Sequence, residues 1–329
     1  MVRVDSTRNR LIHILSENEE TYISGQDISD ALQISRNSVW KHMKALEKDG
    51  YIIEGVPRKG YRILKHPDKV SDNTIKWGLE TEWLGQTIIH KSSAASTQQL
   101  IHQAAADGAK HGTVAILDEQ TAGRGRMNRE WHSAGNKGMW LSILLRPKIL
   151  PQEAPQLTLL TATVLADVLK DYTGVEPMIK WPNDLLINKK KTAGILTEMQ
   201  AEQDQIQYIV VGIGLNINHT SDDIPGMLAS KATSLYLETG KHWSIQELIQ
   251  QFLQKFEAAF DAYLAHGFSD VKKKWESYGF KIGEKIKIKN LKEEKKAIFH
   301  GIAEDGALLV LHDNGKEEKI YSGEIQWFE

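Results

Sequence analysis

Residues 178–196, MIKWPNDLLINKKKTAGIL, decide the fold class of this 329-residue chain. Two short apolar runs, Met178–Lys180 and Leu185–Ile187, flank a Pro-Asn-Asp turn, and a longer run, Lys191–Met199, follows. Runs of this length that are bounded by turn residues predict β-strands. The stretch therefore predicts short strands of a sheet, with polar residues at the turns between them.

The flanking sequence continues this alternation of strands and helices. Strand-like runs occur at residues 88–90, 113–117, 139–145 and 207–217. Helical patterns occur at residues 97–106, 156–172 and 244–265. A sheet covered by helices predicts one mixed α/β domain, which we place at residues 76–277. Beyond it, short runs separated by turn residues predict a small β barrel over residues 278–329.

The first 65 residues follow a different pattern. Three helices are predicted, at residues 8–15, 26–32 and 35–49. The third helix has an apolar stripe, formed by Val39, Met43 and Leu46. Two strands follow, at residues 51–54 and 61–64. This order predicts a winged helix-turn-helix domain over residues 1–65, joined by a polar linker at residues 66–75. The whole chain is therefore predicted to be a multidomain α+β protein.

The winged domain carries a local excess of positive charge. Between residues 36 and 65 there are eight Lys or Arg and three acidic residues, although the whole chain has a formal charge of −2. DNA phosphates require such a local basic footprint. The alternative is a small helical domain with a solvated basic face. We predict DNA contacts from Ser35, Arg36, Asn37, Ser38, Trp40, Lys41, Lys44, Arg58 and Lys59.

Composition excludes several kinds of site. The chain has no cysteine, which excludes disulfides, thiolate zinc sites and cysteine nucleophiles. It has no His-Glu-x-x-His pattern and no Gly-x-Ser-x-Gly elbow, so hydrolysis by a zinc ion or a catalytic triad is not expected. The N-terminal residues contain no apolar signal-peptide core, and no apolar run is long enough to span a membrane. We therefore expect a cytoplasmic location.

The motif Gly123-Arg124-Gly125-Arg126, which follows the strand predicted at residues 113–117, is the first candidate site. Glycines let backbone amides approach an anion closely, and arginine side chains bind phosphate or carboxylate with two parallel hydrogen bonds. The motif is neither a Walker loop nor a Gly-x-Gly-x-x-Gly fingerprint. It predicts an anion site, with a flexible basic surface turn as the alternative.

Three further segments carry candidate ligands. Asn183 and Asp184 place short oxygen ligands beside a strand, and a lone aspartate near phosphates suits Mg²⁺. Lys191 borders an apolar strand, so its ammonium group is able to face a ligand carboxylate. Gly212–Asn216 ends a buried strand with small residues and an amide. Taken alone, these segments are equally compatible with an inert turn, a solvated lysine and a tight strand exit.

Taken in chain order, these motifs resemble the biotin–protein ligases, in particular the bacterial members that also repress the biotin operon. The resemblance covers nearly the whole chain. Besides the winged domain it rests on Ser96-Thr97-Gln98, Gln120–Arg126 with Trp131, Lys180–Asp184, Lys191–Leu196 and Gly214–Asn216. The order Gly-Arg-Gly-Arg…Trp, Lys-Trp-Pro-Asn-Asp and Lys-x-Ala-Gly-Ile-Leu is highly specific. The resemblance implies a central domain similar to class II aminoacyl-tRNA synthetases and a C-terminal SH3-like barrel.

The resemblance also implies the reaction. Biotin and MgATP form biotinyl-5′-AMP and pyrophosphate, and a lysine of a biotin carboxyl carrier protein then displaces AMP. Neither step needs a protein nucleophile, because the main task is to neutralise charge when two anions meet. Accumulated biotinyl-AMP is expected to order the loop at residues 123–131, to favour a homodimer and to let two winged domains bind a two-fold operator.

Residue roles follow from the same resemblance. The residues expected to act in catalysis are Lys191, Arg124, Arg126 and Asp184, with Asp184 also the expected Mg²⁺ ligand. Biotin contacts are expected from Ser96, Thr97, Gln98, Gln120, Gly123, Arg124, Gly125, Arg126, Trp131, Lys191 and Gly194. Adenylate contacts are expected from Arg126, Trp131, Asn183, Lys191 and Asn216.

Three positions depart from the pattern of well-known relatives. Gln98 stands where Asn often follows Ser-Thr, His132 stands where an aromatic residue is common, and Met127-Asn128 replaces more basic residues. Two alternatives remain, a ligand-sensing transcription factor that has lost its activity and a lipoate–protein ligase. The complete charged set of the motifs argues against the first. The motif spelling, together with the winged domain, favours biotin over lipoate.

Overall fold

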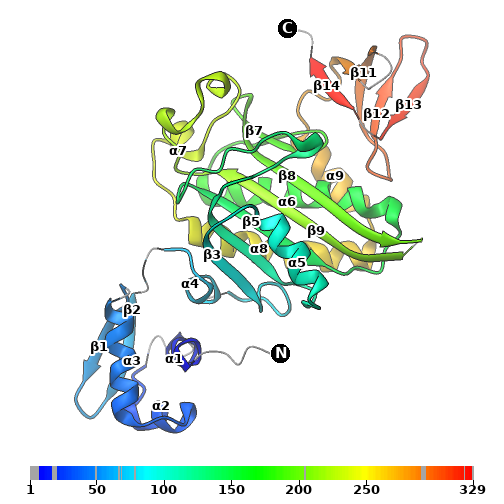
Figure 1. Cartoon of the computed structure of the whole chain (residues 1–329). Helices are drawn as coiled ribbons and strands as arrows, with labels where there is room; N and C mark the ends of the chain where they lie inside the picture. Colours follow the sequence, from blue (N-terminus) through cyan, green and yellow to red (C-terminus); the bar gives the residue numbers. More distant parts are fainter. Residues whose placement is uncertain are drawn as a thin grey trace. The chain divides into compact units, whose positions relative to one another are not determined.

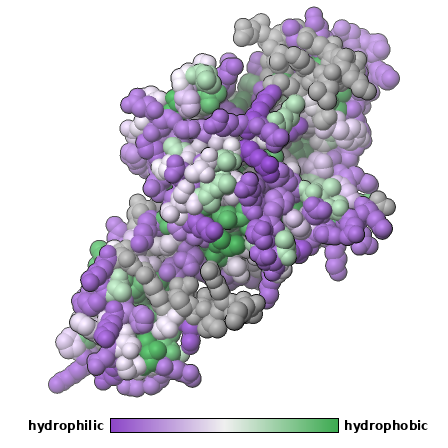
Figure 2. Space-filling view, viewed as in Figure 1, coloured by the Kyte–Doolittle hydropathy of each residue, from purple (hydrophilic) through white to green (hydrophobic). Residues whose placement is uncertain are grey.

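The structure, a computed structural model of the chain, divides into two compact units, residues 1–80 and 81–329 (Figure 1). It describes residues 7–16, 21–48, 50–65, 67, 69–77, 79–203, 205–289, 294–321 and 323–327. Hydrophilic side chains predominate on the face that Figure 2 shows, and hydrophobic ones form only small patches there. Among the described residues, no helix is both long enough and apolar enough to cross a bilayer.

The first unit consists of helices followed by a hairpin and a short helix. Its elements are α1 (Thr7–Ser16), α2 (Gly25–Leu32), α3 (Arg36–Lys48), β1 (Ile52–Val56), β2 (Gly60–Lys65) and α4 (Asp72–Lys76). Ser24 accepts a hydrogen bond from the backbone N–H of Asp27 at 3.0 Å and so caps α2. The stripe of Val39, Met43 and Leu46 on α3 is buried in the core of this unit. The predicted helix-turn-helix and hairpin are confirmed.

The stretch predicted as a linker, residues 66–75, contains the start of α4. Ser71 caps α4, which begins inside the predicted linker, and Ile75 is fully buried. Trp77 packs into the core of the first unit. The division between the two units falls after residue 80. Ile75 and Trp77 lie in a mostly polar stretch, but both side chains are buried because apolar groups are more stable in the protein interior than in water.

The second unit is built on a seven-stranded mixed sheet with the strand order β3-β4-β5-β9-β8-β7-β6. Its strands are β3 (Ile88–Ala94), β4 (Val114–Gln120), β5 (Gly138–Leu145), β6 (Met178–Lys180), β7 (Asp184–Ile187), β8 (Lys190–Glu202) and β9 (Gln205–Asn216). β3 and β4 pair in parallel, and the other neighbours are antiparallel. Every strand predicted in this region is present.

Helices lie on both faces of this sheet, and one face is only partly covered. The helices α6 (Ala154–Thr173), α8 (Ile245–His266) and α9 (Ser269–Tyr278) cover one face, while α5 (Thr97–Ala106) covers part of the other (Figure 1). Ile101 of α5 packs with Leu144 of β5 and Val210 of β9. Further along β9, Gly212 and Gly214 face Gln98 and Trp131 without a side chain, which leaves room on the sheet surface beside the start of α5. A short helix, α7 (Leu235–Thr239), follows β9.

The C-terminal part of this unit is a small antiparallel sheet with the order β13-β12-β11-β10-β14. Its strands are β10 (Lys285–Lys289), β11 (Glu294–Ile302), β12 (Leu308–Leu311), β13 (Glu317–Ile320) and β14 (Glu324–Trp327). The indole N–H of Trp181 donates to the carbonyl of Gly306 at 3.3 Å, and Gln156 donates to the carbonyl of Glu304 at 3.0 Å. These bonds attach the small sheet to the large one. The short strands were predicted, whereas β14 and the polar helix α9 were not.

Candidate active site

A pocket of about 390 Å³ opens on the partly covered face of the large sheet. Among the residues that line it are Ser96, Thr97, Gln98, Gln120, Arg124, Gly125, Arg126, Trp131, Asn183, Asp184, Lys191, Gly194 and Asn216. Gly123 is not part of the lining, but its carbonyl accepts from the backbone N–H of Trp131 at 2.9 Å and closes the loop. The fold thus brings motifs that are far apart in sequence to one cavity, which has the size of a small-molecule site.

One end of the pocket is lined by neutral polar groups joined in a chain. Ser142 donates to the hydroxyl of Thr97 at 2.7 Å, and the backbone N–H of Thr97 donates to Gln120 at 2.9 Å. The amide of Gln120 in turn donates to Ser133 at 2.9 Å. Ser96 caps α5 by accepting from the backbone N–H of Gln99 at 3.2 Å. These bonds fix the polar atoms before any ligand arrives.

Ser142 and Ser133 belong to this chain of hydrogen bonds but were not predicted. Ser142 is the lone polar residue of the buried strand β5. A single polar residue in an apolar strand is a sequence signal, because a buried hydroxyl needs a partner. The partner itself, on a helix elsewhere in the sequence, is visible only in the fold.

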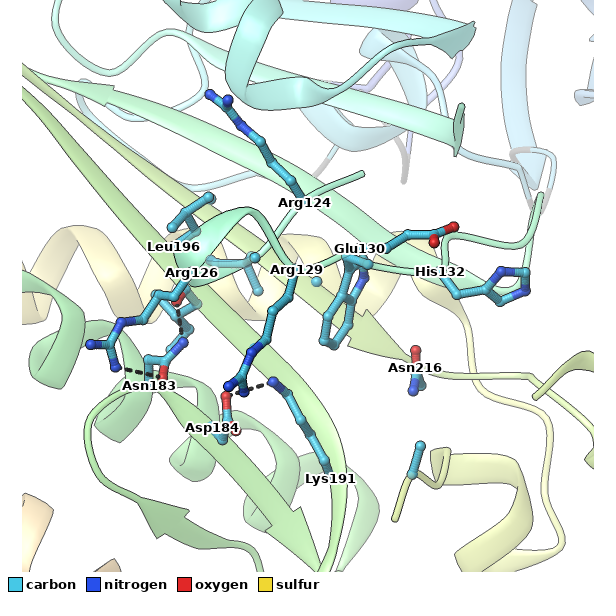
Figure 3. Close-up of a pocket in the computed structure, with 18 of the residues that line it drawn as sticks. Arg124, Arg126, Arg129, Glu130, His132, Asn183, Asp184, Lys191, Leu196 and Asn216 are labelled. Atoms are coloured by element: carbon cyan, nitrogen blue, oxygen red, sulfur yellow. Dashed lines mark hydrogen bonds and ion pairs between the residues drawn. The ribbon is translucent and has the colours of Figure 1, made fainter. Parts of the chain in front are cut away.

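The middle of the pocket carries charge. The ammonium of Lys191 lies 2.7 Å from a carboxylate oxygen of Asp184, and Arg126 donates to the side-chain oxygen of Asn183 at 3.5 Å (Figure 3). The antiparallel strands β7 and β8 bring Asp184 opposite Gly194, near Lys191. Burial lowers the pKa of the Arg126 guanidinium, and the nearby Asp184 carboxylate opposes that effect. Figure 3 also shows the guanidinium of Arg129 beside Asp184, so several cations gather around one carboxylate, a set suited to an anionic ligand.

Trp131 lies against the sheet between the two ends. Its ring centroid is 5.1 Å from the ammonium of Lys191. A Cβ on Gly214 would lie 2.5 Å from atoms of the ring, so only glycine permits this close approach. The loop that carries Trp131 is closed further by a hydrogen bond from the backbone N–H of Gly125 to the carbonyl of Arg129 at 2.7 Å.

Arg124 lines the pocket but stands apart from the other predicted charges. It points away from the pair formed by Asp184 and Lys191 (Figure 3). Its guanidinium lies 3.1 Å from the carboxylate of Glu198 on β8, a residue that was not predicted. The structure thus gathers three of the four predicted catalytic residues, Arg126, Asp184 and Lys191, while the fourth is bound elsewhere.

The far end of the pocket, beyond Asn216, contains a buried histidine that was not predicted. His219 is 1% exposed, and neither ring nitrogen has a hydrogen-bond partner among the described residues. Burial lowers the pKa of His219 to about 4. Beside it, Lys137 donates to both carboxylate oxygens of Asp223 at 2.6 Å, which holds the pKa of Asp223 well below its usual range. His219 follows the Gly214–Asn216 motif by three positions, which is the only sequence signal for it.

The predicted DNA-contacting residues lie on α3, at Ser35 just before it, and on the turn between β1 and β2. All of them are exposed except Ser38, which is half-buried and donates its backbone N–H to Ser35 at 3.2 Å. Trp40 is 53% exposed although it is a large aromatic residue. Nearby, Arg62 pairs with Glu54 at 2.9 Å and lies over the ring of Tyr22. Exposed basic side chains are thus present both on α3 and on the turn between β1 and β2.

Comparisons with known proteins agree with this division. Residues 91–216 match the biotin/lipoate A/B protein ligase family, residues 7–62 an HTH domain, and residues 281–327 the biotin protein ligase C-terminal domain. The chain is 45% identical, over 97% of its length and 98% of the relative's, to the bifunctional ligase/repressor BirA of Bacillus spizizenii. It is 28% identical to the corresponding protein of Escherichia coli, with 96% and 95% of the two chains covered.

A solved structure gives the same answer for the larger unit. The biotin protein ligase from Aquifex aeolicus, in complex with biotin and ATP, is 30% identical and superimposes with a TM-score of 0.63. The match covers 73% of this chain and 98% of the Aquifex chain. The chain therefore belongs to the biotin protein ligase family and is similar along its whole length to the bifunctional ligase/repressors.

Proposed function

We propose that the protein is an ATP-dependent biotin–protein ligase and also a transcriptional repressor of the biotin operon. One observation carries this proposal, namely 45% identity to a bifunctional ligase/repressor over 97% of the chain. Both parts that the two roles need are present, because an HTH match covers the first unit and a ligase match covers the pocket strands. An inactive sensor would not need the connected charges of Arg126, Asp184 and Lys191.

The first step joins two anions. The biotin carboxylate attacks the α-phosphate of ATP, the bond to the β-phosphate oxygen breaks, and pyrophosphate leaves with the formation of biotinyl-5′-AMP. Lys191 and Arg126 neutralise the charge that the carboxylate and the phosphate bring together. Lys191 is held 2.7 Å from Asp184 without ligand, so the incoming anion competes with that carboxylate for the ammonium.

The second step transfers the acyl group to a carrier domain of a biotin-dependent carboxylase. The amine of the acceptor lysine attacks the acyl carbon, the bond to the phosphate oxygen breaks, and AMP leaves. Asp184 is placed to orient this amine and to accept its proton, while Lys191 stabilises the leaving phosphate.

Biotin and the adenylate occupy different parts of the pocket in this proposal. The ureido ring of biotin lies at the neutral end, among Ser96, Thr97 and Gln120. Trp131 closes over the ligand, and Asn216 contacts the adenylate. Asn216 donates to the carbonyl of Thr233 at 3.0 Å, which holds its side chain in place. A Cβ on Gly123 would lie 2.6 Å from the carbonyl oxygen of Trp131 and one on Gly194 3.1 Å from its ring, so these two glycines let Trp131 approach closely.

The site offers a magnesium ion the side-chain oxygens of Asp184 and Asn183. Among the described residues, no group of three or more His, Asp or Glu side chains is arranged to hold a metal. Mg²⁺ often binds through one or two carboxylates and substrate phosphates, and Asp184 supplies one such carboxylate beside Asn183. Asp184 and Asn183 would hold the ion, which when bound with ATP would neutralise phosphate charge.

Repression follows from the shared intermediate. Biotinyl-AMP orders the loop at residues 123–131 and favours a homodimer, which presents two winged domains to a two-fold operator. The catalytic domain, ending at residue 277, is assigned to the fold of class II aminoacyl-tRNA synthetases, and the sheet from residue 278 to an SH3-like barrel. The protein is assigned to the cytoplasm.

Two assays of the purified full-length chain test this proposal. With biotin and MgATP but no acceptor, mass spectrometry of the extracted ligand should detect biotinyl-AMP, and lipoate should not replace biotin. Operator DNA should then be bound more tightly with biotin and MgATP than with either alone. Absence of the adenylate would refute the ligase, and operator affinity unaffected by the two ligands would refute the corepressor role.

A further inference from the structure

The carboxylate of Glu198 on β8 receives three donors from Arg124, Gln98 and His102, of which Arg124 and Gln98 line the pocket. Arg124 lies 3.1 Å from one oxygen, and the other oxygen is 3.2 Å from the amide nitrogen of Gln98. The Nε2 atom of His102 lies 3.1 Å from that second oxygen, and its Nδ1 atom lies 3.2 Å from the hydroxyl of Tyr208. No motif in the sequence pointed to Glu198, and the role proposed for the pocket has not used it.

Gln98 has its amide orientation fixed by these contacts. The side chain is 4% exposed, and its amide nitrogen donates to Glu198 and to the carbonyl of Leu196, both at 3.2 Å. A carbonyl and an ionised carboxylate only accept hydrogen bonds. The reversed amide would place three acceptors against one another, so the nitrogen has to face Glu198 and the oxygen has to face the other way.

The oxygen of Gln98 is consequently an acceptor without a donor. It is buried and has no hydrogen-bond partner among the described residues. It lies over β9, where a Cβ on Gly212 would be only 3.1 Å from it and 3.2 Å from the hydroxyl of Ser142. A buried acceptor without a partner costs free energy, which a ligand N–H group recovers when it donates to that oxygen.

We propose that Glu198 is a positioning residue that selects ligands with an N–H donor, by holding the Gln98 oxygen over Gly212, which lines the pocket together with Gln98. The inference rests on the proposed function, since the ureido ring of biotin carries two N–H groups. The dithiolane ring of lipoate carries none. Glu198 thus contributes to the choice of biotin without touching it.

The carboxylate form of residue 198 is essential to this role. Glutamine at this position has one oxygen for the three donors from Arg124, Gln98 and His102, and its own amide adds a further donor. Gln98 then loses one reason to keep its nitrogen on that side. Glu198→Gln therefore removes one of the two acceptors that orient the Gln98 amide, leaving the carbonyl of Leu196, and keeps the size of the side chain unchanged.

The test is a double-mutant cycle on the full-length chain, with biotin affinity measured by isothermal titration calorimetry. Glu198→Gln and Gln98→Met should each raise the biotin Kd about 10-fold, the order expected when a buried acceptor loses its partner. The double variant should be no weaker than Gln98→Met, because Glu198 acts through Gln98. The KM for biotin should rise in both single variants, and kcat at saturating biotin should change less than twofold. Glu202→Gln, on the same strand with a partner at the hairpin end, is the matched control.

Three results would overturn the proposal. An unchanged biotin Kd in Gln98→Met would show that the oxygen is not used, even if Glu198→Gln fails to fold. Losses that add in the double variant would show that Glu198 acts independently of Gln98. A wild-type chain that binds no biotin would instead refute the proposed function itself, and the inference with it.

Discussion

The two units present their predicted functional residues in opposite ways. On α3 of the first unit, Arg36, Trp40 and Lys41 are exposed, and each is free to meet a partner independently. In the pocket of the second unit, Lys191 is bound to Asp184, Arg126 to Asn183, and Thr97 to Ser142. A substitution in the pocket therefore also leaves the hydrogen-bond or ion-pair partner of the replaced side chain unpaired. A substitution of one of these α3 residues removes only the contact that the replaced side chain makes itself. We expect large, coupled effects in the pocket and small, additive effects on α3.

The largest effect is expected from Lys191→Ala. The substitution removes a cation from the point where two anions meet and leaves Asp184 without its partner. Loss of one such stabilising group typically costs about 10²–10³-fold in rate. Single-turnover formation of biotinyl-AMP measures it, with Lys190→Ala, an exposed lysine of the same hairpin, as the control. A rate within twofold of wild type would remove Lys191 from the chemistry.

A smaller effect is expected from the buried His219, which should make the stability of the protein depend on pH. Its pKa is lowered to about 4 in the folded protein by burial, against an ordinary value of about 6.5. Between these values the unfolded chain binds the proton and the folded chain does not, so stability falls as the pH drops from 6.5 to 4. Because a shift of one pKa unit corresponds to about 1.4 kcal/mol, the unfolding free energy should fall by about 3 kcal/mol over this range.

Urea unfolding of wild type and of His219→Gln across this pH range measures the contribution. The slope of the unfolding free energy against pH should be smaller in the variant. Burial also lowers the pKa of His111, but that histidine is present in both proteins and cancels in the difference. Parallel pH profiles would show that His219 does not titrate in this way.

Thr97→Val should have a moderate effect at the neutral end. It keeps the shape of the side chain, but removes the acceptor of Ser142 and one donor to Gln120. A buried hydroxyl without its partner costs about 1–3 kcal/mol, so biotin should bind roughly ten times more weakly. Thr158→Val, which breaks a hydroxyl pair with Thr197 on the opposite face of the sheet, should leave the biotin Kd unchanged. Equal losses in the two variants would point to a general effect of unfolding rather than to the pocket.

The smallest effect is expected from Lys41→Ala on α3. A lysine that contacts one phosphate contributes mainly through counterion release, so its loss should reduce the salt dependence of operator affinity by about one unit of slope. Lys59→Ala should do the same, and the two losses should add. Fluorescence anisotropy at several salt concentrations measures both slopes. A double variant whose loss of slope differs strongly from the sum of the two single losses would show that these exposed lysines do not act independently.

The sequence predicted the local elements well, and it failed where a contact depends on the fold. The bounds of α5 and the strands around Lys191 follow from periodicity and caps, which are local properties. Glu198 could not be found in this way, because its partner Gln98 lies a hundred residues earlier on another element. The burial of Trp77 was not predicted for a related reason. Its neighbours in sequence are mostly polar, and only the fold shows that its side chain packs into the core of the first unit.

The most direct measurement is the mass of an apo biotin carboxyl carrier domain after incubation with the purified chain, biotin and MgATP. The carrier should gain the mass of one biotinyl group, on its acceptor lysine, and the gain should be lost with Lys191→Ala but not with Lys190→Ala. A carrier of unchanged mass, from a wild-type chain that still binds biotin and DNA, would contradict the ligase and leave a ligand-sensing repressor.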